Sequence, residues 1–371
     1  MKSRQIIWIY IGVRSLRSMT ISWLTRAGGR IEVIHSLRGI AALSVCWFHL
    51  TNGNPSFLPE GLLKASGRYG WLGVEIFFVI SGFVVPYSLA AASYHAGFGS
   101  FGRFLWKRVS RLDPPYLASL GIVIALMFLS AALPGYRGEP IRIVPSQLFL
   151  HFAYLNTLFH YEWLNPVYWS LAIEFQYYLV IGMLFPLVSS SRTWVRLLLL
   201  CALSGCALLL PNPAFLARYL FLFIMGFASF QHRTRIIGPW EWVLITAGAA
   251  LGVAATLGIP AAAAGGFTSA IILGINGTNR ILAWLGSLSY SLYLLHVPVG
   301  GRIINLGERL GGGLPLKVCF LAAALTGSLA SAYLLFRFVE KPCQRYASSI
   351  RLRSLPSEVT LAEHEKAAEH A

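Results

Sequence analysis

Charged side chains are scarce in this sequence of 371 residues. They make up 12% of the chain, whereas hydrophobic side chains make up 56%; an ordinary soluble domain is about 25% charged and about 45–50% apolar. Half the usual charge cannot cover the surface of a soluble globular protein, and this apolar content excludes an intrinsically disordered chain. The composition therefore favours a protein that lies in a lipid bilayer.

Acidic residues are the scarcest charged group. The chain has 14 Asp and Glu against 30 Lys and Arg, which gives a net charge of +16. A nucleic-acid-binding protein is also basic, but its polar surface carries many charges of both signs. Here the excess arises from a shortage of acids, as is typical of a multi-pass membrane protein with basic cytoplasmic loops. We therefore expect the lipid bilayer as a partner, and no nucleic acid.

Patterns that would indicate disulfides or a metal centre are missing. The five cysteines form no CxxC pair, and four of them lie in apolar runs, so we interpret them as packing residues. The sequence also lacks the HxxxH and HExxH spacings that place two metal ligands on one helix. We predict no metal site.

Long apolar runs, by contrast, are abundant. A membrane-spanning helix needs about 20 mostly apolar residues, and ten segments are candidates: 37–52, 71–91, 112–133, 168–188, 195–210, 215–231, 240–258, 260–275, 282–300 and 315–338. With a cytoplasmic N-terminus, ten spans leave 22 Lys and Arg inside and 8 outside, as the positive-inside rule favours. We predict an all-α polytopic membrane protein, a bundle of about ten transmembrane helices with both termini cytoplasmic.

The remaining segments give the domain organisation. Residues 1–33 are predicted to form a basic cytoplasmic arm, 34–346 the membrane domain, and 347–371 a polar cytoplasmic tail. The apolar stretch 146–160 is interrupted by polar groups, so we expect it to lie along the membrane interface or to re-enter the membrane rather than to cross it.

Four ionisable residues lie inside predicted spans, where a charge is costly and a functional role is the first hypothesis. They come from four different helices, and the topology places all of them in the outer half of the membrane: His49, Glu75, Glu174 and His296. A buried structural hydrogen bond is the alternative for any single one. A carboxylate at the depth of His49, from Glu75 or Glu174, could orient its imidazole.

Basic residues near the cytoplasmic ends of the spans form a second group. Arg38 precedes His49 by eleven residues, which places both on one face of a helix, about 16 Å apart along its axis. Arg108 and Arg111 lie one turn apart on a short helical turn and suit a phosphate group. A plain topology signal is the alternative for all three arginines. For Ser81 and Gly82 we favour helix packing or contact with an acyl chain.

Six motifs occur in order along the chain: LRGIAALSVCWFH, GVEIFFVISGF, RFLWKRVSRLDPPY, WSLAIEFQYY, LGSLSYSLYLLHVP and FRFVEKP. Over residues 34–346 the sequence resembles the acyltransferase 3 family of integral-membrane carbohydrate O-acyltransferases. The family's Arg–ten residues–His motif falls on Arg38 and His49, and its RxxR motif on Arg108 and Arg111. Its SGF motif falls on Ser81, Gly82 and Phe83, and its WSL…E motif gives Glu174.

The resemblance implies transfer of an acyl group, above all acetyl, from acyl-CoA to a hydroxyl of a cell-surface or exported carbohydrate or glycolipid. It also implies a place in the bacterial cytoplasmic membrane. Many members carry Asp where this sequence has His35, and Ser36 replaces a neighbouring glycine, which resembles the exopolysaccharide and nodulation branch. Many also carry a C-terminal SGNH hydrolase-like domain; the chain length leads us to expect a stand-alone membrane module.

A mechanism follows as a hypothesis. Arg38, Arg108 and Arg111 would hold the phosphates of acyl-CoA, the co-substrate, and His49 would act as general base on the acceptor hydroxyl. A polytopic transporter or flippase for a glycan or glycolipid is the alternative, because polar groups inside a bundle suit that class too. The two halves of the chain show no evident repeat, which counts against it. A signalling or scaffold protein gives no reason for buried His and Glu on four helices.

Overall fold

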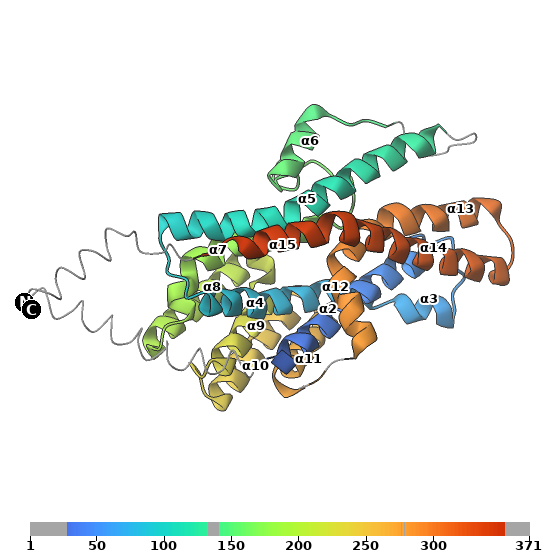
Figure 1. The fold of residues 1–371 in the computed structure, drawn as a ribbon. Coiled ribbons are helices and arrows are strands. Elements are labelled where there is room, and N and C mark those ends of the chain that lie inside the picture. The colour runs from blue at the N-terminus through green and yellow to red at the C-terminus, as the bar shows by residue number, and fades with distance from the viewer. Residues whose placement is uncertain (1–27, 133–140, 276, 278, 353–371) are drawn as a thin grey trace, which may run out of the picture.

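The computed structural model describes residues 28–132, 141–275, 277 and 279–352. Within these ranges every regular element is helical, which confirms the predicted all-α class (Figure 1). The helices are α2 (Gly28–Asn52), α3 (Leu62–Gly67), α4 (Gly73–Ala91), α5 (Phe98–Ala131), α6 (Pro145–Phe152), α7 (Trp169–Val188), α8 (Thr193–Leu209), α9 (Leu220–Arg233), α10 (Pro239–Leu257), α11 (Ile259–Gly274), α12 (Arg280–Leu295), α13 (Arg302–Leu310), α14 (Leu314–Leu335) and α15 (Lys341–Ser349). Short 3₁₀ turns precede α4 (η1, Gly70–Leu72) and α9 (η2, Leu216–Tyr219). Two π-helical turns, η3 (His296–Gly301) and η4 (Phe336–Glu340), follow α12 and α14.

Seven helical stretches are long and apolar enough to cross a membrane: Val33–Asn52, Leu62–Ala91, Phe98–Ala131, Trp169–Val188, Pro239–Leu257, Arg280–Leu310 and Leu314–Ser349. The other three predicted spans fall on the shorter helices α8, α9 and α11, of 17, 14 and 16 residues. The count of ten and the side of the termini therefore stay predictions. Most of the predicted arm (1–33) and tail (347–371) lies outside the described residues.

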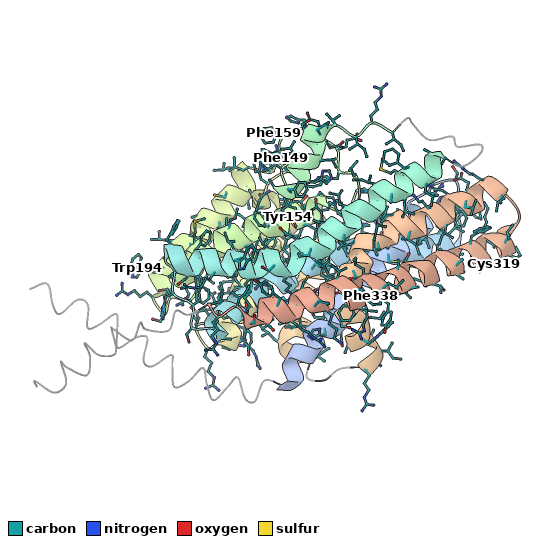
Figure 2. All side chains as sticks on the ribbon, turned by 45° about the horizontal axis from the view of Figure 1, so that its top comes forward. Phe149, Tyr154, Phe159, Trp194, Cys319 and Phe338 are labelled. Carbon is teal, nitrogen blue, oxygen red and sulfur yellow. The ribbon has the colours of Figure 1, made fainter. Side chains whose placement is uncertain are left out.

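The outside of the bundle is rich in large apolar side chains (Figure 2). Phe149, Trp194 and Phe338 are 73%, 60% and 72% exposed. A soluble monomer rarely leaves many such side chains in water, whereas lipid solvates them. The pattern agrees with a multi-pass membrane protein. Within the stretch 146–160 only α6 is helical, and its eight residues are too short to cross.

Helix α5 differs from the prediction. The sequence suggested a span beginning at residue 112, after a short turn that carries Arg108 and Arg111. Instead, α5 is one helix of 34 residues that runs through Pro114 and Pro115. Prolines remove helical hydrogen bonds but do not always end a helix. The two arginines therefore lie within a long helix rather than on a separate turn.

Pro342 does not end a helix, although proline often does. The chain passes through the π-helical turn η4, and Pro342 then lies in the first turn of α15, where a missing N–H costs little. Glu340 lies at the end of η4 and forms no ion pair with an arginine among the described residues. Its carboxylate instead accepts hydrogen bonds from Ser291 Oγ of α12 (2.5 Å) and Gln344 Nε2 (2.8 Å).

Two glycines bring α2 and α12 into close contact. A Cβ on Gly286 of α12 would meet the carbonyl oxygen of His35 on α2, and a Cβ on Gly39 would lie 2.6 Å from the carbonyl oxygen of Leu282. Small residues that let backbones approach are typical of membrane helix interfaces. This contact holds α2 beside α12 (Figure 1), and these two helices bring together the histidines predicted for the site.

Candidate active site

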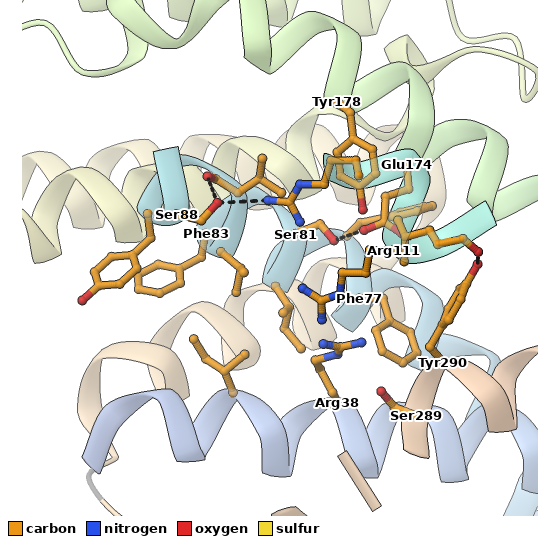
Figure 3. A pocket seen from close by; sticks show the side chains of 18 of the residues that line it. Arg38, Phe77, Ser81, Phe83, Ser88, Arg111, Glu174, Tyr178, Ser289 and Tyr290 are labelled. Atoms are coloured by element: carbon orange, nitrogen blue, oxygen red, sulfur yellow. Dashed lines mark hydrogen bonds between the residues drawn. The ribbon is translucent and has the colours of Figure 1, made fainter. Parts of the chain in front are cut away.

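A cavity of about 630 Å³ lies between α2, α4, α5, α7 and α12 (Figure 3). This volume is in the range of small-molecule sites. Its walls are mostly apolar, but its ionisable side chains are mainly cationic: His35, Arg38, Arg108, Arg111, Arg233 and Glu174. Four arginines around a single carboxylate leave a strong excess of positive charge, so the cavity suits an anionic ligand with a long apolar part.

The guanidinium groups of Arg38 and Arg111 lie next to each other in this cavity, one from α2 and one from α5 (Figure 3). The two like charges repel each other. Among the described residues the two ion pairs are Lys64–Glu60 and Arg196–Glu241, both away from the cavity. Glu340 and Glu174 are near enough to attract Arg38, but neither forms an ion pair with it. The two guanidinium groups therefore keep donors for an anion that accepts from both, such as a phosphate.

Arg108 is held more firmly. Its Nη2 donates to Ser88 Oγ (3.0 Å), and its guanidinium lies over the rings of Tyr178 (5.1 Å) and Phe104 (5.5 Å). Cation–π contacts and a hydroxyl acceptor fix its direction without neutralising its charge. The RxxR pair therefore contains one cation held by neighbouring side chains, Arg108, and one without an ion pair, Arg111, and both line the cavity.

Glu174 lies with the arginines and not with the histidines. Its Oε1 accepts a hydrogen bond from Ser81 Oγ (2.7 Å), which ties α7 to α4. Among the described residues no hydrogen bond joins Glu174 or Glu75 to His49. The prediction that one of these carboxylates orients the His49 imidazole is therefore not supported by a direct contact.

Glu75 is also deeper than predicted. A Cβ on Gly73, two residues earlier, would meet the carbonyl oxygen of Ala41. Ala41 precedes His49 by eight residues, or about 12 Å along the axis of α2. Glu75 is buried, and its Oε2 has no hydrogen-bond partner in the described part of the chain. The expectation that it shares the depth of His49 is wrong, because α4 begins well below the end of α2.

The two predicted histidines do come together. The ring centroids of His49 and His296 are 5.2 Å apart, with the ring planes inclined by 52°. His296 Nδ1 lies 2.9 Å from the carbonyl oxygen of Leu292. A carbonyl can only accept, so this nitrogen carries the proton and Nε2 is an acceptor. His296 is fully buried, and its Nε2 has no partner among the described residues.

A break in α12 positions His296. In an α-helix the carbonyl of Leu294 would pair with the N–H of residue 298, but that residue is proline. Asn165 Nδ2 donates to this carbonyl instead (2.9 Å). The chain continues as the π-helical turn η3, a feature often found at functional sites.

The SGF motif divides between two roles. Ser81 and Phe83 line the cavity. Gly82 does not; a Cβ there would lie 3.0 Å from Cα of Gly226, so this glycine lets α4 contact α9. Gly82 therefore makes no direct contact with a ligand in the cavity, as contact with an acyl chain would require. Its contact with α9 supports the alternative of helix packing.

Sequence reasoning missed several lining residues. Arg233, at the end of α9, was counted only as a topology signal, yet it lines the cavity. Phe77, Ser170 and Tyr293 form the end of the cavity nearest to His296, and they are ordinary residues of apolar spans in the sequence. The described residues contain no group of three or more His, Cys, Asp or Glu side chains that could hold a metal ion.

Comparison with known proteins agrees with this architecture. The family profile described as "Acyltransferase domain" matches residues 31–337. The chain is 27% identical over 381 residues to the putative peptidoglycan O-acetyltransferase YrhL of Bacillus subtilis (84% of this chain, 54% of that protein). It is 25% identical over 365 residues to the O-acetyltransferase OatA of Staphylococcus aureus (84% and 57%).

A shorter match, 29% identical over 151 residues, links it to the putative acetyltransferase ORF330 of Acidianus two-tailed virus (41% of this chain, 40% of that protein). The chain thus spans about half the length of the curated relatives it matches. No solved structure matches it. Because the family profile covers most of the chain, including both histidines and all four cavity arginines, the protein belongs to this acyltransferase family.

Proposed function

We propose that this protein is a multi-pass O-acyltransferase of the bacterial inner membrane. It would move an acyl group, above all acetyl, from acyl-CoA to a hydroxyl of a cell-surface or exported carbohydrate. The observation that carries the proposal is the cavity: it holds Arg38 and Arg111, which form no ion pair among the described residues, and one end of it lies close to the adjacent His49 and His296. The relatives named as O-acetyltransferases support acetyl as the group transferred.

The shape of acyl-CoA matches the distribution of charge. Its phosphates need several cations, which Arg38, Arg108, Arg111 and Arg233 supply, and its pantetheine arm needs an apolar channel, which the cavity walls supply. Arg38 lies eleven residues before His49 on α2. That rise of about 16 Å is comparable to the length of an extended pantetheine, on the order of 15–20 Å.

The transfer itself would use the two imidazoles. His49 takes the proton of the acceptor hydroxyl, the oxygen forms a C–O bond with the thioester carbonyl carbon, and the C–S bond breaks. The proton then passes from His49 to the CoA thiolate, which leaves as the free thiol. His296 would act as a positioning residue: its Nε2 has no partner among the described residues and can accept, so a small turn of the adjacent His49 ring would let His49 donate to it and keep its other nitrogen basic.

Purified protein in lipid nanodiscs, with radiolabelled acetyl-CoA and chitotetraose as the acceptor probe, tests this proposal. Loss of a general base costs about 10²- to 10⁴-fold, so His49→Ala should lose transfer by at least about 100-fold while it remains folded. His95→Ala, which removes an exposed histidine, is the matched control. Full activity of His49→Ala would refute the assignment. In a parallel assay with the protein in sealed liposomes, movement of label across the bilayer without a covalent product would favour the transporter.

A further inference from the structure

The cavity stops one layer of aromatic rings short of the histidines. Phe77 and Tyr293 line it, whereas His49 and His296 do not. The Tyr293 ring lies 5.8 Å from the His296 ring, and Phe77 meets Tyr293 edge-on at 6.0 Å between centroids. One face of this aromatic pair therefore borders the cavity, and Tyr293 reaches His296 directly behind it.

The two rings are anchored very differently. The Tyr293 hydroxyl donates to the carbonyl oxygen of Val167 (3.0 Å) and lies 2.6 Å from Ser170 Oγ. Its side chain is 5% exposed, so it is packed as well as bonded. Phe77 is only half-buried and has no polar group. Its ring can change rotamer without breaking a hydrogen bond, whereas the Tyr293 ring must break two.

We propose that Phe77 and Tyr293 form a selective passage between the donor cavity and the histidine pair. Tyr293 is its fixed wall, Phe77 is the side that yields, and only short acyl groups pass to His49. This inference rests on the proposed function, because it takes acyl-CoA as the donor. It goes further by naming the residues that limit the length of the acyl chain.

The physical reason is the difference in cross-section along the donor. An acetyl group has one carbon beyond its carbonyl, and a modest displacement of one phenyl ring admits it. For a hexanoyl chain, the Phe77 ring must stay displaced while several methylene groups lie in the passage. Apolar sites distinguish one methylene by about 10- to 200-fold. Because Tyr293 cannot move aside, the displacement available to the Phe77 ring sets the longest acyl chain that passes.

The test compares acetyl-, butyryl- and hexanoyl-CoA as donors, with the protein in nanodiscs and chitotetraose as acceptor. In the wild type, kcat/KM should fall steeply with chain length. Phe77→Ala should raise the ratio of hexanoyl to acetyl kcat/KM at least about tenfold. Inhibition by free CoA should change less than about twofold, since the arginines bind its phosphates. Phe77→Trp should have the opposite effect and lower the butyryl to acetyl ratio.

Phe83→Ala is the matched control. It removes the same ring from the same helix and cavity, but six residues or about 9 Å away, where Phe83 stacks on Tyr87. Its absolute rates can fall, but its chain-length ratios should stay those of the wild type. An unchanged ratio in both Phe77 variants, or an equal rise in Phe83→Ala, would overturn the passage. A wild type that transfers no acyl group from any acyl-CoA would instead overturn the proposed function, and the passage with it.

Discussion

Replacing Arg111 by alanine should separate ligand affinity from protein stability. Arg111 faces Arg38 across the cavity, and among the described residues neither has a carboxylate partner in an ion pair. Without a ligand the two charges repel each other. Removing one relieves that repulsion, so the unliganded Arg111→Ala protein should be at least as stable as the wild type.

The effect on CoA binding should have the opposite sign. A hydrogen bond to a charged group contributes about 1.5–3 kcal/mol, so loss of Arg111 should weaken CoA binding about 10- to 150-fold. At 100 times the wild-type Kd, CoA should stabilise the folded protein by about 2.7 kcal/mol. For a variant that binds 30-fold more weakly, the same CoA concentration should give about 0.9 kcal/mol.

Thermal unfolding in nanodiscs, with and without CoA, measures both quantities. Arg111→Lys should recover part of the CoA-induced shift, because it keeps the charge but loses the planar fork. Arg192→Ala, which removes an exposed arginine at the start of α8, should leave the shift unchanged. An Arg111→Ala protein that CoA stabilises as strongly as the wild type would refute the assignment of this arginine to the donor phosphates.

Two further substitutions test the scaffold. Asn165→Ala removes the side-chain donor to the carbonyl of Leu294, so it should lower the free energy of unfolding by about 1–3 kcal/mol. Because this bond positions His296, the variant should lose more acetyl transfer than CoA binding. Equal losses in both assays would contradict this. Gly286→Ala places a methyl group against the carbonyl of His35 and should destabilise the protein by about 1–3 kcal/mol in chemical unfolding. Gly121→Ala is the control: its Cβ would meet open space, so this variant should be as stable as the wild type or slightly more stable.

Most of the helices could be predicted from the sequence, because an apolar segment of about 20 residues in lipid can satisfy its backbone hydrogen bonds only by forming a helix or joining a closed barrel. The breaks between helices were harder to predict. Proline does not by itself reveal whether a helix ends or continues: α5 runs through Pro114, and at Pro342 the chain passes from η4 into α15 without a break. That outcome depends on which neighbouring groups replace the missing hydrogen bonds.

The candidate site was predictable only in part. His49 and His296 stand out because ionisable groups are rare in spans, and the structure brings them together. The depth of Glu75 depends on how far α4 is shifted along α2, which no single-helix pattern encodes. Phe77 and Tyr293 resemble every other aromatic residue of an apolar span, so only their positions at the end of the cavity single them out.

Three side-chain hydrogen bonds at successive levels join helix α12 to two other parts of the chain, η4 and the segment at the start of α7. The bonds join Ser291 to Glu340, Tyr293 to Ser170, and Leu294 to Asn165. Sliding or turning this helix as a rigid rod would break all three at once, at about 1 kcal/mol or more each. Rocking of whole bundles, the usual way a transporter alternates access, is therefore disfavoured here. A static frame of this kind suits a reaction in which the reactants approach each other from opposite sides, and only side chains need to move.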